Sequence, residues 1–185
     1  YYIICDEISM FNTIIIENFF DNFGYLENHF KKIPLLKYNN YPQNHKATKT
    51  EKWPGQRSLP LQINHPFLTQ LMVKEIGQKS DSINLINKPW SVNASIHLRL
   101  DDDNEGDFIH TDASDLTMIV FLGKTNLDSG LNLYDNHNQE IVHIKYVQNR
   151  AVIFHSRRFH KSHLNFGDNI DNGRLTLNCF LEFES

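Results

Sequence analysis

The sequence predicts an α+β domain that is mainly β, in which a jelly roll or small barrel of short strands follows covering helices. From Trp90 onward, short segments rich in branched and aromatic residues alternate with turns of Asp, Asn and Gly. Before Trp90, apolar residues recur at spacings of three and four, which is typical of amphipathic helices. A length of 185 residues with 40% hydrophobic residues suits a single globular domain.

The first half of the chain is expected to be helical and irregular. Residues 14–16 form a β-branched run that favours a short strand, and the apolar spacing over 21–33 predicts a helix. Asn, Lys and Pro dominate 37–60, which indicates a long loop. A second helix is expected over 65–76, ended by Gly77.

The second half is expected to contain eight strands joined by short turns. They span residues 91–100, 107–112, 116–122, 130–134, 140–147, 151–155, 160–165 and 174–184. This organisation predicts one domain over 1–185, in which residues 1–89 are an extension that braces a core formed by 90–185.

Charge and composition weigh against several classes of protein. The formal net charge of −4 supplies no general basic excess for nucleic-acid binding, although Lys46, Lys49, Lys52 and Arg57 leave room for a local basic groove. No apolar run approaches the roughly 20 residues of a membrane helix. The two cysteines lack metal-site or disulfide spacing, which favours a reducing compartment, and we expect a cytoplasmic protein.

A histidine and a carboxylate in one predicted strand suggest a metal site. His110 and Asp112 are two residues apart, and such residues point to the same face of a strand. A further histidine from the region around residue 155 would complete two imidazoles and one carboxylate, the facial triad that holds non-haem Fe(II). His155, His160 and His163 all compete for that third position.

The strand predicted over 174–184 divides into two faces. Its apolar residues are expected to face outward, against the helices: Leu175, Leu177, Cys179 and Leu181. Arg174, Thr176 and Asn178 share the other face. An arginine directed inward needs an anionic partner, and its planar guanidinium suits a carboxylate. That partner is a ligand or, alternatively, Asp168 or Asp171 in a structural ion pair.

These motifs resemble those of the Fe(II)/2-oxoglutarate-dependent dioxygenases, whose core is a double-stranded β-helix, a jelly-roll and cupin-like fold. The sequence His-Thr-Asp at 110–112 matches the HxD pair, His160 the distal histidine, and Arg-Leu-Thr at 174–176 the Rx(S/T) element. The resemblance covers residues 90–185. Residues 1–89 are more loosely similar to the helical extension of the prolyl-hydroxylase-like branch.

The resemblance implies a site and a reaction. His110, Asp112 and His160 would be the Fe(II) ligands and the catalytic centre, while Arg174 and Thr176 would hold the far carboxylate of the cosubstrate 2-oxoglutarate. Such an enzyme uses O2, with ascorbate as a stimulant, hydroxylates an unactivated C–H bond, and releases succinate and CO2. An aspartate at position 112 indicates hydroxylation, because related halogenases have a small residue there.

The family pattern also bears on the open choices. The spacing from Phe154 favours His160 over His155 and His163 as the distal ligand. Phe121 stands where animal prolyl hydroxylases of oxygen sensing place a tyrosine that bonds the cosubstrate, and Thr176 is expected to take over that bond.

The expected partner is a peptide or a small molecule. The substrate would be a peptidyl side chain, prolyl by branch resemblance, or a small amino-acid-like metabolite. The alternative is a non-redox, cupin-like metal- or ligand-binding protein. Nucleic acid is disfavoured, no membrane association is expected, and the sequence does not indicate an oligomeric state.

Further side chains are expected near the cavity. Strand parity directs Arg99 and Asn132 inward. The segment from Trp53 to Arg57 is either a turn anchored by its tryptophan or a lid that carries Arg57 towards the substrate. Five other histidines are expected at the surface or behind the site: His29, His45, His65, His137 and His143.

Overall fold

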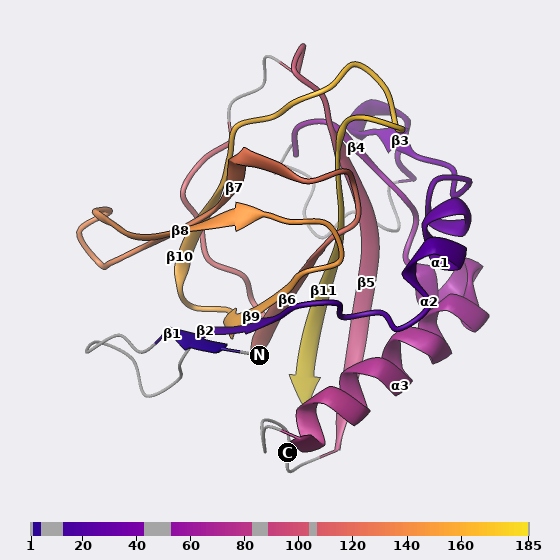
Figure 1. Ribbon diagram of the computed structural model, residues 1–185, viewed down its shortest axis with the longest axis horizontal. Coiled ribbons are helices and arrows are strands. Elements are labelled where there is room, and N and C mark those ends of the chain that lie inside the picture. Colours follow the sequence, from indigo (N-terminus) through magenta and orange to yellow (C-terminus); the bar gives the residue numbers. More distant parts are fainter. Residues whose placement is uncertain (1, 5–12, 43–52, 83–88, 104–106, 185) are drawn as a thin grey trace.

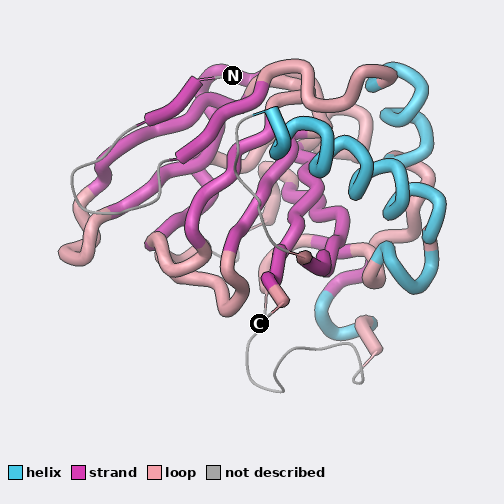
Figure 2. Tube along the Cα trace, turned by 90° about the horizontal axis from the view of Figure 1, so that it is seen from below, coloured by secondary structure: helices cyan, strands magenta, loops and turns pink. Residues whose placement is uncertain are grey.

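Two antiparallel β-sheets lie face to face in the computed structural model, and helices cover the outer side of the larger sheet (Figure 1). The structure describes residues 2–4, 13–42, 53–82, 89–103 and 107–184. Figure 2 shows the helices gathered on one side of the strands. The predicted mainly-β, double-sheet architecture with covering helices is confirmed.

The larger sheet has eight strands and the smaller has three. In spatial order, the larger sheet consists of β1 (Tyr2–Ile4), β2 (Thr13–Ile16), β9 (Ala151–His155), β6 (Leu116–Phe121), β11 (Arg174–Phe183), β5 (Trp90–Arg99), β4 (Gln56–Arg57) and β3 (Leu36–Lys37). The smaller sheet consists of β10 (Phe159–His163), β7 (Asn126–Tyr134) and β8 (Glu140–Tyr146). The helical segments are α1 (Phe23–Phe30), the 3-10 turn η1 (Tyr38–Asn40), α2 (Leu61–Asn64) and α3 (Pro66–Ser82).

The outer face of the larger sheet packs against the helices through a continuous apolar cluster. On β11, Leu175 and Leu177 are fully buried in this cluster, together with Met72 of α3. The Cys179 sulfur lies 3.3 Å from the Met72 sulfur. The alternation of β11 therefore directs its apolar face to the helices, as predicted, and leaves Arg174 on the inner face.

A second apolar cluster lies between the two sheets. Phe121 of β6 stacks on Tyr146 of β8 with ring centroids 4.5 Å apart. The Tyr146 hydroxyl donates to the Leu175 carbonyl and accepts from the Gly123 amide. Added Cβ atoms at Gly123 would lie 2.6 Å from a backbone oxygen, so this close approach requires glycine. The cluster closes one part of the space between the sheets, and the adjoining part is polar.

Three local expectations are wrong. Residues 107–112 do not form a regular strand, because their ladder is limited to one bridge between His110 and His160. Helix α3 continues through Gly77 to Ser82; an internal glycine costs only about 1 kcal/mol, and burial of residues such as Ile76 offsets it. The predicted loop over 37–60 contains η1 and β4.

The N-terminal residues contribute strands as well as helices. β1 to β4 extend both edges of the larger sheet, so that β4 pairs with β5 and β2 pairs with β9. Lys46, Lys49 and Lys52 of the suggested basic groove lie outside the described residues. In the described part of the chain, no helix combines the length and apolar character needed to cross a bilayer.

Candidate metal centre and adjoining pocket

Three side chains of the expected triad converge at one end of the inter-sheet space. Potential ligand atoms of His110, Asp112 and His160 all lie within 4.8 Å of one another. Nε2 of His160 is 3.4 Å from Oδ2 of Asp112, and Nε2 of His110 is 3.9 Å from Oδ1. Two backbone hydrogen bonds, of 3.1 and 2.9 Å, join His110 to His160 and set the two imidazoles side by side.

Both imidazoles are oriented so that Nε2 faces the centre. Nδ1 of His110 lies 2.9 Å from the Phe108 carbonyl oxygen, and Nδ1 of His160 lies 2.9 Å from that of Arg158. Because a carbonyl only accepts, each Nδ1 carries the proton and each Nε2 lone pair is free for a metal. Burial lowers the pKa of His160, against the opposing effect of Asp112, and this favours the neutral imidazole that metals bind.

The carboxylate is held by a hydroxyl network. Thr117 Oγ1 donates to Asp112 Oδ2 at 2.7 Å and lies 2.9 Å from Ser156 Oγ. Ser156 Oγ is in turn 2.8 Å from Ser114 Oγ, and its carbonyl accepts from the Asp112 amide. Such partners orient a ligating carboxylate before the metal binds.

The two competing histidines lie away from this centre. His155 is exposed, and its Nδ1 accepts from the Arg157 amide. The ring of His163 packs against His143, with centroids 4.8 Å apart. Among the described residues, only His160 joins His110 and Asp112 in a group of potential metal ligands.

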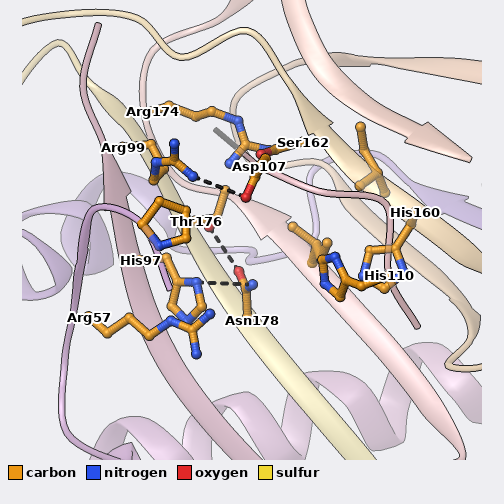
Figure 3. Close-up of a pocket in the computed structure, with 13 residues that line it drawn as sticks. Arg57, His97, Arg99, Asp107, His110, His160, Ser162, Arg174, Thr176 and Asn178 are labelled. Carbon is orange, nitrogen blue, oxygen red and sulfur yellow. Dashed lines mark hydrogen bonds and ion pairs between the residues drawn. The ribbon is translucent and has the colours of Figure 1, made fainter. Parts of the chain in front are cut away.

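Arg174 lies in a pocket that adjoins the triad (Figure 3). Its side chain is buried and Nη2 donates to the Gly130 carbonyl at 3.1 Å, but Nε has no hydrogen-bond partner in the described structure. Asp168 instead bonds Asn172 within its own turn, and Asp171 lies 3.2 Å from Lys31. The structural ion pairs considered for Arg174 are therefore not formed.

A chain of hydrogen bonds lines the floor of the pocket. Thr176 Oγ1 donates to Asn178 Oδ1 at 2.8 Å, and Asn178 Nδ2 lies 3.3 Å from Nδ1 of His97. Nε2 of His97 is 3.0 Å from the Ser95 hydroxyl. Because the amide nitrogen of Asn178 donates, Nδ1 of His97 accepts and its Nε2 carries the proton.

Several residues that line the pocket were not predicted from the sequence, and His97 is one of them. Burial first, and then the charges of Arg57, Arg174 and Arg99, lower the pKa of His97 well below its usual range. The sequence of β5 does indicate the position of His97, because His97 and Arg99 alternate with the buried Ile96 and Leu98. The parity argument that directed Arg99 inward applies equally to His97.

Of the other residues predicted to lie near the cavity, some line the pocket and one does not. Arg99 and Arg57 line the pocket, whereas Asn132 does not. The Asn132 amide oxygen lies 2.6 Å from Nδ1 of His143, on the side of the smaller sheet opposite its buried leucines. Trp53 packs edge-on against Tyr41 and contacts the Arg57 guanidinium, as expected of a turn anchored by its tryptophan, whereas the lid remains a prediction.

Solved oxygenase structures share this architecture. The non-haem α-ketoglutarate-dependent epimerase SnoN from nogalamycin biosynthesis superposes with a TM-score of 0.67 at 12% identity, over 92% of this chain and 76% of that chain. An oxidoreductase of the 2OG-Fe(II) oxygenase family from Burkholderia pseudomallei has a TM-score of 0.55 at 12% identity, with coverages of 92% and 84%. A Pseudomonas putida prolyl-4-hydroxylase has a TM-score of 0.54 at 14% identity, with 95% of both chains covered.

The chain has the fold of the Fe(II)/2-oxoglutarate oxygenases. The double-stranded β-helix implied by the sequence resemblance is thereby confirmed. No family model matches the sequence, and no curated protein sequence matches it either. At these low identities the likeness concerns the fold, and the chemistry has to be argued from the side chains themselves.

Proposed function

We propose that this protein is an Fe(II)- and 2-oxoglutarate-dependent dioxygenase that hydroxylates an unactivated C–H bond and releases succinate and CO2. One observation carries the proposal. Two imidazoles of the pocket, His110 and His160, share a group of potential metal ligands with the adjacent Asp112, and the same pocket holds a buried arginine, Arg174, whose Nε lacks a partner among the described residues. A metal-chelating dicarboxylate would satisfy both features at once.

His110, Asp112 and His160 are the proposed metal ligands and the catalytic centre. Two neutral nitrogens and one carboxylate on one side of an ion are the donor set that suits Fe(II) and leaves positions open. When bound, iron and 2-oxoglutarate supply the oxidising power for the reaction with O2. The chain contributes the fixed orientation of the Nε2 atoms and of the Asp112 carboxylate.

Arg174 and Thr176 are the proposed anchor for the far carboxylate of 2-oxoglutarate. The guanidinium offers donors at a fixed position, because Gly130 already holds one of its Nη atoms. Phe121 has no hydroxyl, and the Tyr146 hydroxyl that lies behind it is occupied by Leu175 and Gly123. Neither ring can therefore supply the tyrosine bond of animal prolyl hydroxylases, which supports a role for Thr176.

The proposed substrates are peptidyl side chains, prolyl ones included, and small amino-acid-like metabolites. The similar structures include both a prolyl-4-hydroxylase and an epimerase of nogalamycin biosynthesis, so they support the class of chemistry without selecting a substrate. Asp112 favours hydroxylation, since its carboxylate stands where halogenases keep a small residue.

The proposal is tested by uncoupled turnover. Purified protein with Fe(II), ascorbate and 2-oxoglutarate should release succinate slowly without a prime substrate. Asp112→Ala should abolish the release, whereas Asp128→Ala, a change at an exposed aspartate, should preserve it. If calorimetry with Mn(II) detects no 2-oxoglutarate binding, the proposal is wrong, and the non-redox jelly-roll binding protein becomes the better description.

A further inference from the structure

Three arginines line the pocket, but their partners differ. Among the described residues, two carboxylates pair with Arg99: Nη1 lies 3.1 Å from Asp107, and Nε lies 3.4 Å from Asp103. Arg174 donates to a carbonyl and is assigned to the cosubstrate under the proposed function. Arg57 has no ion pair or hydrogen bond from its guanidinium within the described residues, and its Nε is buried. The positive charge of Arg57 is therefore not neutralised by any described residue.

The position of Arg57 separates it from the proposed cosubstrate anchor. Arg57 on β4 is in register with His97 on β5, which is in register with Thr176 on β11. Neighbouring strands lie about 4.8 Å apart, so the backbones of Arg57 and Thr176 are roughly 10 Å apart across the sheet. Figure 3 shows Arg57 beside His97, with Arg174 beyond Thr176. A single carboxylate held by Arg174 and Thr176 does not account for Arg57.

Aromatic side chains hold Arg57 in place. Its guanidinium carbon lies 4.6 Å from the centroid of the Trp53 ring. Trp53 is fixed in turn by edge-on contacts with Tyr38, at 4.7 Å, and Tyr41, at 4.8 Å. A guanidinium whose one face contacts an aromatic ring still presents its N–H donors at the edge of its own plane, where a planar anion can accept them.

Arg57 is half-buried with a fully buried Nε, and a cation in such a position is costly unless a ligand supplies the opposite charge. Burial lowers the pKa of Arg57 to about 10, while Tyr41, Asp112 and Asp107 act in the opposite direction. Arg57 therefore remains a cation near neutral pH. The Asp107 carboxylate lines the same pocket, so a singly charged anion fits it better than a doubly charged phosphate.

We propose that Arg57 binds a carboxylate group of the prime substrate. The inference rests on the proposed oxygenase function and narrows its substrates to small molecules or peptides that present a free carboxylate near the metal. It favours the amino-acid-like metabolite over an internal residue of a peptide, because an internal residue has no main-chain carboxylate to offer.

Acetate and its neutral isostere acetamide are suitable probes. The protein is loaded with Mn(II) and 2-oxoglutarate, and the relaxation of the probe's methyl protons by the bound Mn(II) is followed during titration. We expect acetate to bind about tenfold or more tightly than acetamide, because a charged hydrogen-bond pair is worth about 1.5–3 kcal/mol. Arg57→Gln should remove this preference and Arg57→Lys should keep part of it. Arg157→Gln, at an exposed arginine, serves as the matched control.

Several results would overturn the proposal. One is equal affinity of the wild type for acetate and acetamide. Another is an unchanged preference for acetate in Arg57→Gln. A third is displacement of acetate by inorganic phosphate at a concentration below that of acetate. A larger effect of Arg57→Gln on 2-oxoglutarate than on acetate would assign Arg57 to the cosubstrate instead. Arg174→Gln should show the opposite order of effects.

Failure of the proposed oxygenase function can be distinguished from failure of the proposal for Arg57. If Mn(II) or 2-oxoglutarate does not bind, the acetate titration is made by calorimetry on the metal-free protein, where it still tests Arg57. Folding is checked by thermal unfolding without ligands. Arg57→Gln should unfold close to the wild type, because losing the contact with Trp53 opposes the removal of a charge that has no carboxylate partner. Arg99→Gln should unfold earlier, because it leaves Asp107 without its partner. Unfolding of Arg57→Gln as early as that of Arg99→Gln would indicate a structural role and contradict the proposal.

Discussion

The two ends of the pocket differ in how far the protein satisfies its own polar atoms. At the metal end, each imidazole has a carbonyl partner and the Asp112 carboxylate has the Thr117 hydroxyl. At the arginine end, Nε atoms of Arg57 and Arg174 are buried without partners in the described structure. A metal requires lone pairs in a fixed direction, which internal hydrogen bonds provide. An anion requires donors that are still free, and internal hydrogen bonds would consume them.

The largest expected effect is the loss of a metal ligand. His160→Ala should weaken Mn(II) or Fe(II) binding by more than about 100-fold, above the usual cost of losing only an orienting partner. His163→Ala should retain most of the affinity, because that ring packs against His143 and not against the triad. Calorimetric metal titration of both variants checks this. If His163→Ala loses metal binding and His160→Ala keeps it, the distal ligand on β10 is His163 and the proposed triad is wrong.

The second effect tests the arginine end. Arg174→Ala should raise the 2-oxoglutarate concentration needed for half-saturation by about 10- to 100-fold, the equivalent of one charged hydrogen-bonded contact. Metal affinity should change far less, since Arg174 is not among the triad. Succinate release at varied 2-oxoglutarate and at varied Fe(II) separates the two quantities. Equal increases in the half-saturating concentrations of 2-oxoglutarate and Fe(II) would mean that Arg174 has a structural role. The metal end and the arginine end of the pocket would then not differ in function.

A smaller effect tests the bracing of the metal end. Thr117→Val keeps the shape of a fully buried side chain but removes the donor to Asp112. Metal affinity should fall by about tenfold, because the carboxylate loses its preset orientation. Thr125→Val, at a hydroxyl that accepts from Gln148, is the control. An unchanged affinity in Thr117→Val would show that the network does not prepare the site.

The smallest effect concerns pH. The pKa of His97 is depressed in the folded protein, so its contribution to stability is present above the unfolded value near 6.5 and is lost as pH falls below it. His97→Gln should therefore reduce the acid-side slope of the unfolding free energy by up to about 1.4 kcal/mol per pH unit. Urea unfolding over a pH series measures this. His137→Gln, at an exposed histidine, should keep the wild-type slope, and an identical slope in His97→Gln would contradict the prediction.

Much of the architecture could be predicted because strands carry their orientation locally. The alternation of Arg174 and Thr176 with Leu175 and Leu177 predicted both faces of β11 before any partner strand was known. The same parity brought His110 and Asp112 to one side, even though their segment forms no regular strand. The direction of a side chain in a strand follows from its position relative to its immediate neighbours, so it can be predicted from a single sequence.

The missed features depend on residues that are distant along the chain. That Arg57 stands beside His97 follows from the pairing of β4 with β5, and no local pattern encodes that register. One partner of Arg99 is likewise Asp107, which the sequence analysis placed in a strand and did not connect with Arg99. The contrast between a paired and an unpaired arginine, on which the substrate inference depends, is a property of the assembled sheet.

The central place of β11 has a consequence for how the molecule is made. Residues that pair between β5 and β11 are 75 positions apart at Arg99 and Arg174, and 93 apart at Trp90 and Phe183. Contacts of such long range slow folding towards the millisecond-to-second regime of β-rich domains. At about 5–20 residues per second, a ribosome needs roughly 4 to 15 seconds to pass from Arg99 to Arg174. During that interval β5 has an open edge that invites aggregation, and the proposed cosubstrate anchor does not yet exist.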